Sequence, residues 1–236
     1  ETMRREGFEL VIGQPQVLVK EIAGKKNEPF ENLVVDVPAE FSGKVIDLVT
    51  QKKGEMLIME TKGEMQHLEF EIPSRGLIGL RSNMLTNTQG EAVMAHRFLE
   101  YKPWKGPIPG RSNGVLISKN QMATTAYSID KLQDRGSFFV DPGDEVYVGQ
   151  IIAEHIKPGD LVVNATEGKK LTNMRASGSD DSVRIIPKVQ MTLEECMEYI
   201  QQDECIEVTP KNIRLRKVIL DEDDRKRVQK SMKSEA

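Results

Sequence analysis

Cysteine is scarce in this sequence, whose 236 residues include only Cys196 and Cys205 and no C-x-x-C string. Two thiols at this spacing indicate neither a disulfide framework nor a structural zinc site. Apolar runs are short as well: none approaches the roughly 20 residues of a membrane-spanning helix. The opening residues, E-T-M-R-R-E, lack the basic and then apolar pattern of a signal peptide. We therefore expect a cytoplasmic protein with free thiols and no membrane partner.

A nucleotide-phosphate loop is also missing. No segment reads G-x-x-x-x-G-K-[ST], the pattern in which backbone N–H groups hold phosphates and a hydroxyl binds magnesium. Glu1 falls inside what reads as a helix, which is typical of a chain cut from a longer protein. The prediction is a fragment without enzymatic activity, without catalytic residues and without a cofactor of its own.

The histidines give no metal site. His67, His96 and His155 are far apart in the sequence, each within an expected strand. His67 shares a strand face with Glu69 and Glu71, and together these could bind a cation. Apolar residues alternate with them, which is the ordinary pattern of a strand with one solvated face. We favour that simpler interpretation and predict no metal.

Excess positive charge is absent too. The chain has 33 Lys and Arg against 37 Asp and Glu, for a net charge of -4. Domains that bind nucleic acid over a broad surface are usually strongly basic. Any contact with RNA must therefore be confined to a few places.

The hydrophobic periodicity divides the chain into three segments. Residues 1–28 read as a short helix, an extended stretch and a linker, too little to form a core. Residues 29–102 follow the order βαββαβ, which predicts a ferredoxin-like domain. Residues 103–236 begin within a proline-rich stretch, Tyr101–Gly110, and read as a β-rich, barrel-like domain with one or two helices. The predicted fold class is therefore α+β.

In the ferredoxin-like segment, alternating and helical spacing locate the elements. The expected strands are Leu33–Val37, Met56–Thr61, Met65–Ile72 and Ala92–Leu99, and the expected helices are Phe41–Val49 and Ser74–Met84. Ser74 is the expected N-cap of the second helix. Gly76 and Gly79 lower its helix propensity, so we expect close packing there.

The last segment has short apolar runs separated by turn signals. Its expected strands are Val115–Ser118, Ala123–Ile129, Ser137–Val140, Glu145–Val148, Gln150–His155, Leu161–Asn164, Val183–Ile186, a strand near Ile206 and Ile213–Lys217. Thr192 with Glu195 forms a capping box that predicts a helix. Asp221 starts a terminal helix whose acids precede its bases, as expected for a solvated helix.

A basic segment between Gly168 and Gly178 reads G-K-K-L-T-N-M-R-A-S-G and contains almost nothing apolar to bury. Cations and short polar side chains of this kind contact nucleic-acid backbones. The candidate RNA-binding residues here are Lys169, Lys170, Thr172, Asn173, Met174, Arg175 and Ser177. The alternative interpretation is an exposed loop that binds nothing.

The strand Ile213–Lys217 is a second candidate. Ile213 and Leu215 are expected to face inward, which places Arg214 and Arg216 on the outer face. Two arginines two residues apart on a strand can align with a phosphate backbone. RNA contact and a plain exposed face both remain open for this strand.

Long strings resemble one family of proteins. The chain contains MRREGFEL at Met3–Leu10, SRGLIGLRS at Ser74–Ser82, NGVLIS at Asn113–Ser118, LQDRG at Leu132–Gly136, VYVGQII at Val146–Ile152 and GKKLTNMRASG at Gly168–Gly178. These strings resemble the C-terminal half of the TypA/BipA family of bacterial translational GTPases, nearly from end to end.

The resemblance implies a ribosome-binding role. Residues 1–28 would end the third domain, and residues 29–102 would correspond to domain V of elongation factor G. The expected partners are large-subunit ribosomal RNA, an A-site tRNA and ribosomal proteins of the factor-binding centre. The family is linked to large-subunit assembly, stress adaptation and virulence. GTP and magnesium would bind an N-terminal domain outside this chain.

Two other functions stay open at this point. The chain could be a protein-interaction module with a mobile basic loop. It could also be an enzyme for a phosphate-bearing ligand held by Lys169, Lys170 and Arg175, although the sequence places no acid-base pair nearby.

Overall fold

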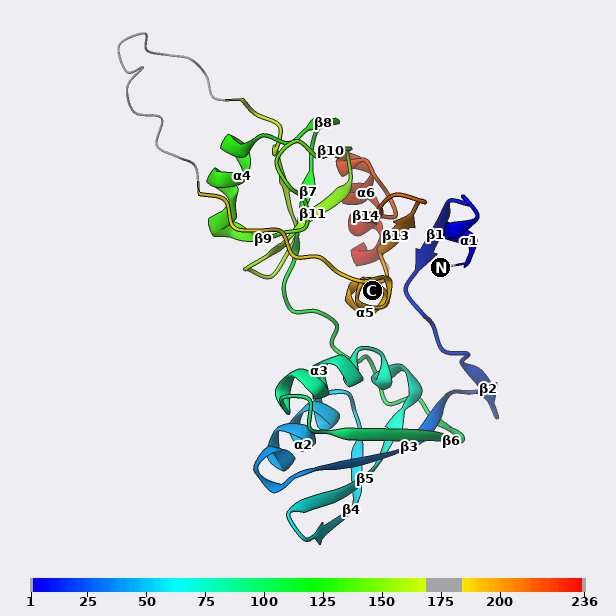
Figure 1. Cartoon of the computed structure of the whole chain (residues 1–236). Helices are drawn as coiled ribbons and strands as arrows, with labels where there is room; N and C mark the ends of the chain where they lie inside the picture. Colours follow the sequence, from blue (N-terminus) through cyan, green and yellow to red (C-terminus); the bar gives the residue numbers. More distant parts are fainter. Residues whose placement is uncertain (1, 169–183, 235–236) are drawn as a thin grey trace. The chain divides into compact units, whose positions relative to one another are not determined.

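A computed structural model describes residues 2–168 and 184–234 of the chain (Figure 1). The chain divides into two compact units, which are described separately. One comprises residues 15–110, called here the ferredoxin-like unit, and the other comprises residues 1–14 and 111–236, called the C-terminal unit. Over the described residues, no helix is long and apolar enough to cross a bilayer.

The ferredoxin-like unit has the predicted βαββαβ order. Its elements are β2 (Lys20–Ile22), β3 (Lys25–Pro38), η1 (Ala39–Phe41), α2 (Ser42–Gln51), β4 (Glu55–Lys62), β5 (Met65–Pro73), η2 (Ser74–Leu77), α3 (Leu80–Asn87) and β6 (Val93–Pro103). β3 pairs with β5 on one side and β6 on the other, and β4 pairs with β5. All these pairings are antiparallel, giving the order β6-β3-β5-β4 of a ferredoxin-like sheet.

The core of this unit lies between the sheet and its two helices, which lie side by side in Figure 1. Leu33, Val35 and Val37 of β3 are fully buried, as their alternation predicted. They pack against Val45 and Val49 of α2. Strand and helix periodicity thus place one apolar face of each element in a common core.

The second helix differs from the expectation. Ser74 does not cap it, because residues 74–77 form a short 3-10 turn and α3 begins only at Leu80. Ile78 is extended, and Gly79 takes φ 71°, a left-handed conformation that favours glycine. Gly76 does pack closely, since a Cβ there would lie 2.8 Å from the Lys52 carbonyl oxygen.

An ion pair holds the end of the ferredoxin-like unit in place. Glu28 is fully buried and accepts hydrogen bonds from the Arg75 guanidinium and from the backbone N–H of Lys105. The Arg75 guanidinium also donates to the Gly106 carbonyl and stacks on Trp104, 3.8 Å from the ring centroid. The proline-rich stretch is therefore attached to this unit through one buried carboxylate.

The C-terminal unit is β-rich, as predicted. Its elements are α1 (Thr2–Arg5), β1 (Leu10–Gly13), β7 (Val115–Ser118), β8 (Met122–Ala123), α4 (Ala126–Leu132), η3 (Gln133–Arg135), β9 (Gly136–Phe138), β10 (Glu145–Val146), β11 (Gln150–His155), β12 (Leu161–Val163), α5 (Leu193–Tyr199), β13 (Glu204–Val208), β14 (Ile213–Lys217) and α6 (Glu222–Ser234). The main sheet runs β1-β13-β14-β11-β7-β12, with β9 also paired to β11. Over the described strands it is an open sheet rather than a closed barrel.

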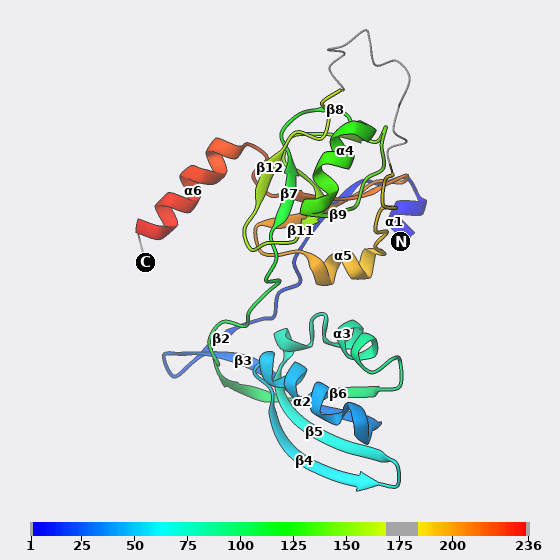
Figure 2. The same ribbon diagram turned by 90° about the vertical axis from the view of Figure 1, so that its left-hand side faces the viewer.

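The predicted strand Ala123–Ile129 is wrong. Only Met122–Ala123 is extended, and α4 follows because the Thr125 hydroxyl accepts the backbone N–H of Ser128 and caps it. The capping box of Thr192 and Glu195 at the start of α5 is confirmed. Asp221 accepts the N–H groups of Asp223 and Asp224 at the start of α6. Figure 2 shows this helix from the side.

The two faces of the main sheet are covered unequally. One face packs against α5, in a core that includes Ile206, Val208 and Leu215 of β13 and β14. A second core, around Ile129 of α4, covers the other face over β7 and β11 but contains no residue of β13 or β14. The outer face of β13 and β14 is therefore left without an apolar cover from that core.

Residues 1–14 group with the C-terminal unit because β1 pairs with β13, from Leu10 opposite Val208 to Gly13 opposite Cys205. The sequence instead assigned residues 1–28 to the end of a preceding domain. A strand edge pairs with whichever partner is available, so this pairing does not test that assignment. The boundaries 1–28, 29–102 and 103–236 stay predictions.

Candidate RNA-binding surface

The basic segment predicted to bind RNA falls outside the described residues. This applies to Lys169, Lys170, Thr172, Asn173, Met174, Arg175 and Ser177. The residues on either side, up to Gly168 and from Arg184 onward, are described. The contacts of these flanking residues are given below.

Helix α4 holds the stem that precedes the segment. The hydroxyls of Thr125 and Ser128 both donate to the Glu167 carbonyl oxygen, at 2.6 and 2.7 Å. Thr125 also caps α4, so the same side chain starts the helix and fixes the stem. Ser128 is buried, which makes this attachment part of the folded unit rather than a chance surface contact.

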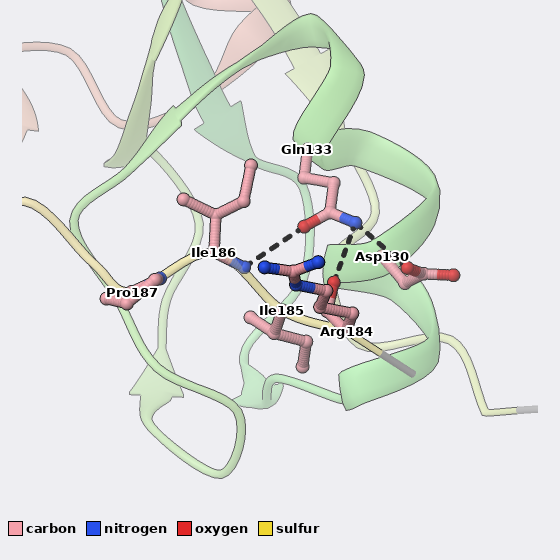
Figure 3. Close-up of a pocket in the computed structure, with 6 residues that line it drawn as sticks. All are labelled: Asp130, Gln133, Arg184, Ile185, Ile186 and Pro187. Carbon is pink, nitrogen blue, oxygen red and sulfur yellow. Dashed lines mark hydrogen bonds between the residues drawn. The ribbon is translucent and has the colours of Figure 1, made fainter. Parts of the chain in front are cut away.

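The stem that follows the segment is tied to the other end of α4 (Figure 3). The Gln133 side-chain amide donates to the Arg184 carbonyl oxygen at 3.1 Å and accepts the Ile186 N–H at 3.3 Å. Asp130 accepts a second hydrogen bond from the same amide at 2.9 Å and orients it. Glu167, Arg184 and Ile186 thus all contact the same short helix or its caps.

The second candidate, Arg214 and Arg216 of β14, lies on the outer face of the main sheet. Leu215 between them is buried against α5, as the predicted alternation requires. Both guanidinium groups approach Glu207 of β13, at 3.5 Å from Arg214 and 3.8 Å from Arg216. The register that pairs Glu207 with Arg214 makes this contact.

Tyr147 completes the group, and we call Tyr147, Glu207, Arg214 and Arg216 the Glu207 cluster. The Tyr147 hydroxyl donates to Glu207 at 2.8 Å. Burial and this hydrogen bond raise the pKa of the Tyr147 hydroxyl, so it remains a donor at neutral pH. No sequence motif marks Glu207, although pairing residues outward from the turn between β13 and β14 places it opposite Arg214.

A second ionic group occupies the other end of the same two strands. We call Arg111, Asp160, Asp203, Glu204 and Lys217 the Glu204 cluster. The Lys217 ammonium lies 2.6 Å from Asp160, 2.8 Å from Asp203 and 3.0 Å from Glu204. Arg111 donates to Glu204 at 2.9 Å. Burial lowers the pKa of Lys217, but the three carboxylates outweigh it and the pKa is raised.

Other chemistry has little support among the described residues. No group of three or more His, Cys, Asp and Glu side chains in this part of the chain is arranged to hold a metal ion. His67 instead contacts the carboxylates of Asp36 at 2.7 Å and Glu69 at 3.3 Å.

Residues 110–114 read G-R-S-N-G, which has the spacing of a serine-nucleophile turn. Such a turn follows a strand and opens a helix, whereas Ser112 is exposed and directly precedes strand β7. The spacing therefore has no catalytic context.

Comparisons with known families match the two units. The family model described as "TypA/BipA C-terminal domain" matches residues 113–222, and the one described as "Elongation factor G C-terminus" matches residues 25–111. The two matches meet at the proline-rich stretch where the structure also separates its units.

Curated relatives are similar along the whole chain. Proteins named "Large ribosomal subunit assembly factor BipA" are 46% identical in Salmonella typhimurium, 44% in Haemophilus influenzae and 46% in Synechocystis sp.. These alignments cover 100%, 99% and 92% of this chain, but only 39%, 38% and 37% of the relatives. The chain thus spans little more than a third of their length. A crystal structure of ttk003000868 from Thermus thermophilus is 23% identical with a TM-score of 0.33 over 34% of this chain and 12% of that one, too weak to bear on the fold.

Proposed function

The chain belongs to the TypA/BipA family, and from this premise we propose that it is the ribosome-binding portion of a translational GTPase that acts in large-subunit assembly. The observation that carries the proposal is the paired match, in the expected order, of an elongation-factor-G-type domain and the TypA/BipA C-terminal domain. The name of the relatives supports the ribosomal partner.

GTP hydrolysis belongs elsewhere in the full-length protein. The residues present do not fit a GTP and magnesium site, because the chain has no G-x-x-x-x-G-K-[ST] segment. The role proposed for this chain is therefore binding, and catalysis is assigned to a domain outside it.

The finer contacts are proposed from charge and placement. With a net charge of -4, the chain must concentrate its cations where it meets RNA. Arg214 and Arg216 supply two on the outer face of β14, where their side chains are 31% and 19% exposed. Lys169, Lys170 and Arg175 supply three more in a segment whose stems are both fixed to α4.

Through these residues the C-terminal unit would contact large-subunit ribosomal RNA and the acceptor end of an A-site tRNA. The ferredoxin-like unit would lie near ribosomal proteins of the factor-binding centre. The proposed location is the cytoplasm, where ribosomes assemble, and the proposed physiological role includes adaptation to stress and control of virulence.

Replacing Lys169, Lys170 and Arg175 together by Ala tests the RNA contact. Affinity for purified large ribosomal subunits should fall, and the log-log dependence of affinity on salt should flatten by up to about 2 to 3, since each lost phosphate contact removes close to one unit. Melting temperature should hardly move, because a polar segment with almost nothing apolar to bury contributes little to folding, about half a kcal/mol or less for such substitutions.

The matched control replaces Lys226, Arg227 and Lys230 of α6, three cations on a helix whose own acids can neutralise them. It should bind subunits nearly as the parent does. If the Lys169, Lys170 and Arg175 variant binds as tightly as the parent across the salt series, the basic segment does not bind RNA and a protein-interaction function is favoured instead. Equal losses in both variants would mean that only overall charge matters.

A further inference from the structure

The Glu207 cluster leaves guanidinium donors unused. Arg216 makes one hydrogen bond, from its guanidinium to the Lys217 carbonyl at 3.2 Å, and Arg214 makes none to the described residues that meets hydrogen-bond geometry. The contacts of both with Glu207, at 3.5 and 3.8 Å, are longer than the 2.7–2.9 Å of a charge-assisted hydrogen bond. Each guanidinium carries five N–H groups. Both partly exposed guanidinium groups therefore have N–H donors without an acceptor among the described residues.

Stability does not account for the cluster. The side chains of Glu207, Arg214 and Arg216 keep 26%, 31% and 19% of their surface exposed. Ion pairs in contact with water contribute about 0 to 1 kcal/mol to folding. The face also lacks the apolar cover that α4 provides over β7 and β11. Two partly exposed arginines held side by side suit recognition better than folding.

Glu207 has two opposing effects at this site. Its carboxylate lies between the guanidinium groups and keeps them on one face, and it also accepts the Tyr147 hydroxyl. The same negative charge offsets one of the two positive charges and repels a phosphate. The cluster presents a net charge of about +1 where the two arginines alone would present +2.

We propose that the Glu207 cluster is a phosphodiester-binding site for RNA in which Glu207 is a built-in counter-ion that limits affinity. An RNA phosphate binds the free N–H donors of Arg214 and Arg216, and the Tyr147 hydroxyl, fixed by Glu207, lies beside them. The proposal rests on the proposed ribosomal function and adds Tyr147 and Glu207 to its binding surface.

The test is Glu207→Gln, which removes the charge but keeps an oxygen that accepts from Tyr147. Affinity for purified large subunits should rise about 3- to 5-fold, the effect of one added unit of charge near a solvent-exposed phosphate. The salt dependence should steepen by about one unit, because one more guanidinium pairs with phosphate rather than with Glu207. Protein-free large-subunit ribosomal RNA should show the same gain.

The matched control is Glu198→Gln, which makes the same charge change on α5, the helix on the opposite face of the sheet. It should change affinity less than 2-fold, within about a third of a log unit. Adding Arg214→Ala to Glu207→Gln should abolish the gain. The melting temperature of the Glu207→Gln variant should stay within about 3 °C of the parent, which shows that it folds.

Unchanged or weaker binding by folded Glu207→Gln would overturn the proposal. A gain with subunits but not with protein-free RNA would identify a protein partner and also overturn it. Failure of the parent chain to bind subunits at all would instead refute the proposed function, so the two failures are distinguishable.

Discussion

Strands β13 and β14 hold two ionic clusters whose central carboxylates, Glu204 and Glu207, differ in their access to water. In the Glu204 cluster, the Glu204 side chain is fully buried and Lys217 is 2% exposed, while the outer partners Asp160 and Asp203 are 33% and 55% exposed. In the Glu207 cluster, three positions along β13, the corresponding side chains keep a fifth to a third of their surface exposed. Period-two alternation causes the difference, since Glu204 faces inward with Ile206 and Glu207 faces outward.

Solvent access decides what each cluster can do. A buried charge has lost its hydration and must be fully paired, so removing one partner leaves the other uncompensated. A charged side chain that stays partly exposed keeps part of its hydration and can exchange partners with little loss of free energy. Glutamate and arginine side chains therefore stabilise the fold at one end of the strand pair and are available for a ligand at the other.

The largest expected effect is that of Glu204→Gln. It should destabilise the C-terminal unit by about 3 to 5 kcal/mol, because the charges of Arg111 and Lys217 remain buried with less compensation. Urea unfolding followed by circular dichroism measures it. Trp104, the single tryptophan, lies in the ferredoxin-like unit, and its fluorescence transition should not move.

Glu207→Gln is the matched comparison, and it should lower the free energy of unfolding of the C-terminal unit by at most about 1 kcal/mol. Equal destabilisation by the two substitutions would contradict the comparison, because Glu207 would then stabilise the fold as much as the buried Glu204 does.

A smaller effect is expected from Glu28→Gln in the ferredoxin-like unit. Glu28 is as buried as Glu204, but it pairs with one guanidinium rather than with two cations. The expected loss is about 2 to 3 kcal/mol. Here the fluorescence transition of Trp104, which stacks on Arg75, should shift to lower urea.

The control for this variant is Glu60→Gln, in the same unit, where the carboxylate is 59% exposed and its nearest cation lies 3.9 Å away. The urea-unfolding midpoint of this variant should match that of the parent. If the urea-unfolding midpoint of Glu28→Gln equals that of the parent, the buried ion pair of Glu28 and Arg75 does not contribute to the stability of this unit.

The smallest effect concerns His67, whose pKa is raised by hydrogen bonds to Asp36 and Glu69. A raised folded-state pKa stabilises the unit below the unfolded value of about 6.5, and that contribution is lost as pH rises through the folded value. The ferredoxin-like unit should therefore be slightly more stable at pH 6 than at pH 8.

Titration of His67 by NMR checks the shift. Its pKa should lie above the usual range in the parent and move back toward it in Asp36→Asn, which removes the first of the two partners. A His67 pKa that is the same in both proteins would contradict the assignment of the shift to Asp36.

Sequence patterns located much of the fold and only part of the candidate site. Alternation located β3 and β11, and the capping box located α5, because these signals lie within a few residues of each other. Helix α4 was missed, since its single cap at Thr125 lies within an apolar run that reads equally well as a strand. The break at Ile78 was missed for a related reason, because a glycine at 79 fits either a packed helix or a left-handed turn.

The sequence by itself determined the order of elements, the α+β class, the family and the outward position of Arg214 and Arg216, because each depends on neighbours along the chain. The tertiary structure alone decided what these arginines face. Strand register places Glu207 beside them. Tyr147, 60 residues before Glu207 in the sequence, donates a hydrogen bond to Glu207. The tertiary structure also decided that Lys217, one residue beyond Arg216, is buried among three carboxylates. Both outcomes depend on which parts of a sheet face are covered, and coverage is set by packing between segments distant in sequence.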